Sequence, residues 1–115
     1  MADEDIIQAA RKLGETIAAS PEAGALKQAR EGLNNSEDTK QLLNQTQQHV
    51  QTLQQKEQQG QPLEPEDKQK MEKLQGELMA DPTFKSFNAA QVEYVDLMRK
   101  VNDTLREQLA DIEGE

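Results

Sequence analysis

Side chains able to carry out catalysis are scarce in this sequence. Its 115 residues include one histidine, His49, and no cysteine. Histidine is the usual general acid or base, and a serine nucleophile needs such a base to activate it. Two of the three serines, Ser20 and Ser36, precede expected helices, where a hydroxyl caps the first turn; the third is Ser86. We therefore expect no catalytic residues, no enzyme activity and a structural role for His49.

The same residue types give no expectation of a metal or a cofactor. Without cysteine the chain can form no disulfide, thiolate metal site or cysteine-ligated iron–sulfur cluster. Glu64, Glu66 and Asp67 stand together at an expected helix start, where acidic side chains are favoured by the helix dipole. No stretch has the oxygen-ligand spacing of an EF-hand calcium loop. The sequence therefore predicts neither a metal site nor a cofactor site.

Composition limits the class of partner and the size of the core. The formal net charge is −9, which opposes direct binding to nucleic acid. The N-terminus lacks a signal-peptide pattern and no apolar run approaches the length of a membrane span, so we expect a cytoplasmic protein without membrane contact. Only 34% of the residues are hydrophobic, so burial against a second copy or another partner is favourable from the outset.

The elements that must position these residues are helices, because proline-marked caps recur and no strand alternation persists. We expect an all-α fold with about five helices in an antiparallel helical bundle, a long C-terminal helix, and a single helical domain over 1–115. The expected helices cover about 3–19, 21–33, 37–59, 65–80 and 82–112, with a linker at 60–67. The stretches "IAASPEAGAL" and "LMADPTFKSF" share one pattern, in which Ser20 or Asp81 caps a helix that begins with Pro21 or Pro82.

The last helix carries a sustained heptad. Nine positions, seven of them apolar and two of them glutamine, follow one another at alternating steps of three and four: Phe84, Phe87, Gln91, Tyr94, Met98, Val101, Leu105, Gln108 and Ile112. A helix of this length spans about 45 Å, whereas a globule of this size is about 30 Å across. We therefore predict a self-interface or core seam at Phe84, Phe87, Gln91, Tyr94, Met98, Val101 and Leu105, and a homo-oligomer that is a dimer or a higher even-numbered assembly.

Two features of this seam have alternative interpretations. Gln91 either sets register and partner choice, as polar core positions do in coiled coils, or marks the place where the helix leaves its core. Phe84, Phe87 and Tyr94 form either a recognition patch for a protein partner or part of a core or self-interface.

Over nearly its whole length the chain resembles the YlbF/YmcA family of small helical bacterial proteins, which includes the YheA group. The stretches that carry the resemblance are "DIIQAARKLGETIAASPE", "LKQAREGL", "QQKEQQGQPLEPED" and "LQGELMADPTFKSFNAAQ". Two departures stand out. The chain has no cysteine to hold the iron–sulfur clusters associated with complex-forming members, and Glu64 stands where relatives tend to place a threonine.

The resemblance implies a non-enzymatic, cytoplasmic bacterial protein that self-associates and works through protein–protein interaction. Some members regulate a complex that assists the endoribonuclease RNase Y and affects competence, sporulation and biofilm formation. The first hypothesis is thus a helical regulator or adaptor. The alternative is a prefoldin-like holdase, in which the long polar helices hold unfolded chains.

Overall fold

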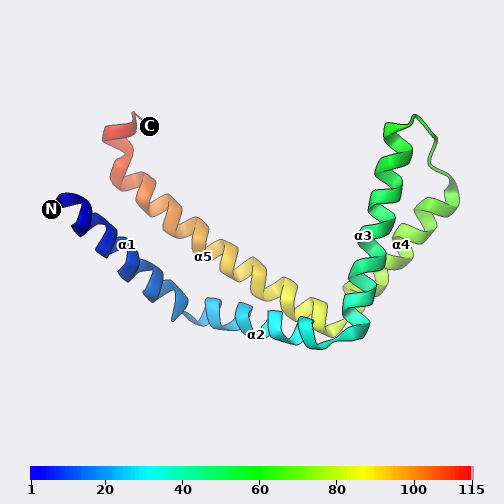
Figure 1. Ribbon diagram of the computed structural model, residues 1–115, viewed down its shortest axis with the longest axis horizontal. Coiled ribbons are helices and arrows are strands. Elements are labelled where there is room, and N and C mark those ends of the chain that lie inside the picture. Colours follow the sequence, from blue (N-terminus) through cyan, green and yellow to red (C-terminus); the bar gives the residue numbers. More distant parts are fainter. Residues whose placement is uncertain (115) are drawn as a thin grey trace. The chain divides into compact units, whose positions relative to one another are not determined.

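The structure is a computed structural model that describes residues 1–114. It consists of five α-helices, and no strand occurs in this range. Their bounds are α1 (Ala2–Ala18), α2 (Pro21–Asn35), α3 (Glu37–Gln58), α4 (Pro65–Ala80) and α5 (Pro82–Glu113) (Figure 1). The all-α class and the long C-terminal helix are confirmed.

The helices begin where proline and capping residues place them. Pro21, Pro65 and Pro82 are the first residues of α2, α4 and α5, a position where the missing N–H has no intrahelical partner to lose. Ser20 accepts a hydrogen bond from the backbone N–H of Ala23 at 3.2 Å. Asp81 likewise accepts from the backbone N–H of Phe84, so both repeated corners are confirmed as a helix break followed by a capped helix start.

Contacts between Cα atoms divide the chain into two units. The terminal unit comprises Met1–Ala29 together with the residues from Asn88 onward, and the hairpin unit comprises Arg30–Phe87. The expectation of a single domain over 1–115 stays a prediction.

The hairpin unit is built on the contact between α3 and α4. Helix α3 ends where Gly60 adopts a φ of 71°, a left-handed conformation that glycine reaches without a steric cost. Leu74 of α4 is 5% exposed and is the buried apolar side chain of this unit. Two polar side chains of α3, Thr39 and His49, are buried as well. Polar groups therefore make up much of the hairpin's small interior.

In the terminal unit, α1 and the start of α2 run along α5 (Figure 1). Leu13 of α1 lines a shared hollow with Val101 and Leu105 of α5. Among the described residues of the terminal unit, the buried apolar side chain is that of Ala90, which is 7% exposed. No helix between residues 1 and 114 combines the length and the apolar character needed to cross a bilayer.

Candidate functional site

The predicted seam residues all lie on α5, but they differ in burial. Phe84 and Phe87 belong to the hairpin unit, and the other five belong to the terminal unit. Gln91 and Leu105 are exposed, whereas the other seam residues, Phe84, Phe87, Tyr94, Met98 and Val101, are half-buried. The seam therefore lies on one continuous helix, and its role as an interface stays a prediction.

Large apolar side chains remain exposed outside that seam too. On α5 these are Val92, Val95 and Leu109, and Ile112 at the C-terminal end is 81% exposed. On α1, Ile6 and Ile7 are also exposed. Scattered surface apolar residues are normal, but a row of them along one helix is typical of an interaction surface.

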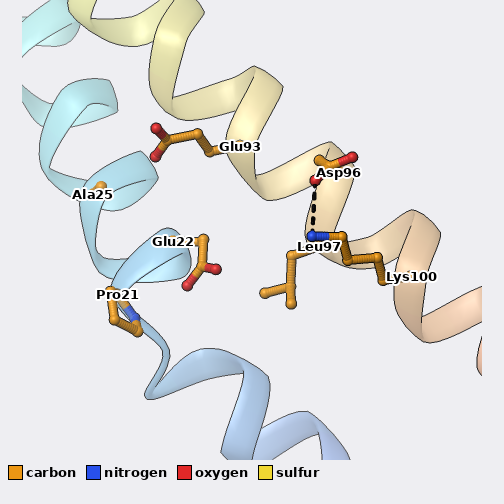
Figure 2. A pocket seen from close by; sticks show the side chains of 7 residues that line it. All are labelled: Pro21, Glu22, Ala25, Glu93, Asp96, Leu97 and Lys100. Atoms are coloured by element: carbon orange, nitrogen blue, oxygen red, sulfur yellow. Dashed lines mark ion pairs between the residues drawn. The ribbon is translucent and has the colours of Figure 1, made fainter.

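A hollow of about 540 Å³ lies between the start of α2 and the middle of α5. Figure 2 shows its lining, in which Glu22 and Leu97 point toward one another from the two helices. The lining residues are Pro21, Glu22, Ala25, Glu93, Asp96, Leu97 and Lys100. The hollow is thus acidic with an apolar side, and its lining contains no histidine or hydroxyl side chain.

Asp96 is the electrostatic centre of this hollow. One of its carboxylate oxygens lies 3.3 Å from Lys100 Nζ, and the other pairs with the guanidinium of Arg99. The hydrogen bond from Lys100, followed by the charges of Lys100 and Arg99, holds the pKa of Asp96 below its ordinary value. Asp96 is therefore an anion that positions two neighbouring cations, and a general acid would need the opposite shift.

His49 connects the two helices of the hairpin. It is 5% exposed, and its Nε2 lies 2.9 Å from the backbone carbonyl oxygen of Asp67. Because a carbonyl oxygen can only accept a hydrogen bond, Nε2 is the protonated ring nitrogen in this contact and donates the hydrogen bond. The structure thus places His49 in a hydrogen bond between helices, in agreement with the structural role expected for it.

A chain of hydroxyl hydrogen bonds joins the starts of α3 and α5. Ser36 Oγ accepts from the N–H of Thr39 and donates to Thr39 Oγ1 at 2.8 Å. The Thr39 hydroxyl, which is fully buried, lies 2.9 and 3.0 Å from the two carboxylate oxygens of Asp81. Asp81 also accepts from the N–H of Phe84 at 2.9 Å. The helix caps predicted at Ser36 and Asp81 are therefore correct, and one buried threonine connects them.

These contacts favour the charged form of Asp81. The backbone N–H of Phe84 contributes most to lowering its pKa, and the Thr39 hydroxyl and the N–H of Thr83 add to the effect. Sequence reasoning missed Thr39, because nothing in the local pattern distinguishes it from an ordinary polar residue in a first helical turn.

The opposite end of the hairpin carries an ion pair. Lys56 Nζ of α3 lies 2.7 Å from Asp67 Oδ2 of α4, and the same oxygen accepts from the N–H of Glu64 at 3.0 Å. The hydrogen bond from Lys56 is the largest cause of the lowered pKa of Asp67. The start of α4 is therefore held by Asp67, whose side chain accepts from the N–H of Glu64, the residue that stands where relatives tend to place a threonine.

The polar groups described so far serve the architecture of the helices. Within residues 1–114, no group of three or more histidine, aspartate or glutamate side chains is placed to hold a metal ion. Among the helices of this range, α5 exposes the most large apolar side chains.

Two comparisons with known proteins bear on the identity of the chain. No curated protein matches the chain at a significant level. The model of one protein family, described as "Control of competence regulator ComK, YlbF/YmcA", matches residues 6–110, which is nearly the whole sequence. The chain therefore belongs to the YlbF/YmcA family.

Proposed function

We propose that this protein is a non-enzymatic helical adaptor that self-associates through α5 and regulates its target through protein–protein contact. Family membership supports a regulatory role. The observation that carries self-association is the apolar surface left on α5, where Val95, Leu105 and Ile112 are 57, 47 and 81% exposed.

The thinness of the core supports the same proposal. The buried apolar side chains of the described residues are Leu74 and Ala90, one in each unit. Covering one whole Val, Leu or Ile side chain contributes about 1.5–3 kcal/mol. A second copy that covers the exposed positions of α5 would therefore add burial on a scale that this core cannot supply by itself.

The self-interface is proposed to include the predicted seam, from Phe84 through Tyr94 and Met98 to Leu105. Its half-buried members leave surface for a partner to cover. The regulated process is proposed to be competence control, in line with the family description. A link to RNase Y belongs to the same proposal and rests on what the family resemblance implies.

Gel filtration with light scattering tests self-association. The expected result is a mass of two or more chains at micromolar concentration, and a one-chain mass contradicts the proposal. Tyr94→Asp and Met98→Asp should dissociate the assembly, because a charge would be buried in the interface. Charge reversal at the exposed residues Lys68 and Lys70 provides the control and should leave the mass unchanged.

Affinity purification from the native cell tests the adaptor role, with one stoichiometric protein partner as the expected result. Suppression of the aggregation of a denatured client, without any such partner, would instead support the holdase alternative.

A further inference from the structure

The apolar residues of α5 can be connected at heptad spacing in a second way. Starting at Val95, steps of three and four lead through Val95, Met98, Asn102, Leu105, Leu109 and Ile112, a set that we call the outer stripe. It shares Met98 and Leu105 with the predicted seam. The other seam residues near them, Tyr94 and Val101, lie on one side of these two shared residues. The other apolar residues Val95 and Leu109 of the outer stripe lie on the opposite side of them.

The two sides of α5 have different surroundings in the structure. Leu97 lines the hollow beside α2, and Val101 lines the hollow that contains Leu13 of α1. A helix turns by about 100° per residue, so Val95 lies about 160° around the axis from Leu97. Val95 and Leu109 are accordingly 57 and 40% exposed. The side of α5 with Leu97 and Val101 faces the chain's own helices, and Val95 and Leu109 lie on the opposite side. Leu105 lies at the border between the two sides, because it also lines the hollow that contains Leu13.

We propose that the outer stripe is the surface on which a second copy of this chain docks, with the two α5 helices parallel and in register. This inference rests on the proposed self-association and adds the face and the orientation of the contact. In heptad terms Val95, Asn102 and Leu109 occupy position a, and Met98, Leu105 and Ile112 occupy position d. The stripe extends over about 26 Å of helix.

The exposed apolar surface suits a contact of this kind. The exposed fractions of Val95, Leu105, Leu109 and Ile112 are 57, 47, 40 and 81%, which amounts to more than two whole side chains per copy. In a symmetric pair each copy covers the other, so the covered surface doubles.

Asn102 favours the parallel, in-register arrangement. An asparagine at a single a position lies opposite the same residue of the second copy, where the amide of one can donate to the amide oxygen of the other. A shift of the register by one heptad places this amide against Val95 or Leu109, which leaves its polar atoms without a partner. Asn102 thus acts as a register marker within an apolar stripe.

The charges beside the stripe disfavour the antiparallel alternative. Arg99 and Arg106 occupy position e, next to the stripe. An antiparallel pair that matches Val95 with Ile112 brings Arg99 of each copy opposite Arg106 of the other, and like charges in such positions repel. A parallel pair instead places Arg99 beside Tyr94 and Arg106 beside Val101 of the second copy. The Arg99 and Tyr94 side chains can then make a cation–π contact.

Single cysteine variants test this arrangement directly, because the chain has no cysteine of its own. Asn102→Cys places one thiol in the stripe, and the matched control Asp103→Cys moves it one position around the helix. Two facing a positions bring Cβ atoms close enough for a disulfide. Under mild oxidation, Asn102→Cys should become a covalent two-chain species on a non-reducing gel, whereas Asp103→Cys should stay predominantly one chain. The yield of the two-chain species should be at least tenfold higher for Asn102→Cys than for Asp103→Cys.

The outcomes separate this inference from the proposed function. A two-chain mass in solution with no cross-link at Asn102→Cys overturns the parallel arrangement and leaves self-association standing. Cross-linking between a Val95→Cys chain and an Ile112→Cys chain, but not within either variant, would show an antiparallel pair and overturn it too. Equal cross-linking of Asn102→Cys and Asp103→Cys overturns the choice of face. A one-chain mass of the unmodified protein overturns both proposals.

Discussion

Replacing Val95 with glutamine separates the association of two copies from the folding of one. Val95 is 57% exposed and Val92, one turn earlier, is 60% exposed. The two valines therefore differ mainly in the side of the helix from which their side chains project. Glutamine is a better helix former than valine, so neither change should reduce helicity. Val92→Gln is therefore a matched control in residue type, exposure and helix propensity.

The expected loss of affinity follows from the surface that a second copy would cover. Burying a whole valine contributes at the lower end of about 1.5–3 kcal/mol, so the exposed part of Val95 accounts for about 1 kcal/mol in each copy and about 2 kcal/mol in a pair. A change of this size weakens dimerisation about 30-fold. Because Val92 lies beside the stripe, Val92→Gln should weaken it by less than about threefold.

Sedimentation equilibrium gives the dissociation constants, and circular dichroism at a fixed concentration verifies that the helices are retained. Equal weakening by the two variants would refute the assignment of the contact to the outer stripe. Unchanged affinity in Val95→Gln would refute it as well.

Three further predictions concern the hairpin unit. Thr39→Val keeps the side-chain volume but removes a fully buried hydroxyl, so the free energy of unfolding should fall by about 1 kcal/mol; urea unfolding measures this, and an unchanged midpoint would contradict the role given to Thr39. His49→Phe removes the donor to the Asp67 carbonyl and should lower Tm by about 4 °C in a thermal scan; an unchanged Tm would leave that hydrogen bond without a stabilising role. The pKa values of Asp67 and Asp81 are lowered from 3.8 in the folded chain, so their contribution to stability is present above that pH and is lost as the pH falls through the lower folded values. Urea midpoints should therefore decline in this acidic range, and a midpoint that rises on acidification would show the opposite sign.

The bounds of the helices could be predicted from the sequence because local chemistry determines them. Pro21, Pro65 and Pro82 can occupy a first helical position but not an interior one, and Ser20 and Ser36 supply an acceptor for the first turn. Such signals act within three or four residues, so they are readable without knowledge of the fold.

The partners of the buried polar groups could not be predicted in this way. The hydrogen bonds from Thr39 to Asp81 join residues 42 positions apart. The acceptor of His49 is a backbone carbonyl, and every residue has one. Side-chain type therefore indicated what His49 could donate but not which group would receive it.

Which side of α5 the chain's own helices cover was ambiguous for a different reason. The apolar residues of α5 lie in three adjacent rows along the helix, so a series of steps of three and four can follow either of two pairs of neighbouring rows. The sequence analysis followed the pair that contains Tyr94 and Val101. Only the position of α1 and α2 shows that Val101 faces the chain's own helices and that Val95 does not.

The small interior also has a consequence for calorimetry. Within the described residues the buried apolar side chains are Leu74 and Ala90, so unfolding a single copy brings little additional apolar surface into contact with water. The heat-capacity increment and the denaturant dependence of unfolding both scale with that surface, and both should be small for a dilute sample. With the proposed self-association, both should grow as the protein concentration is raised, since dissociation then becomes part of the unfolding reaction. The width and midpoint of the melting transition would then depend on the concentration of the chain as well as on its sequence.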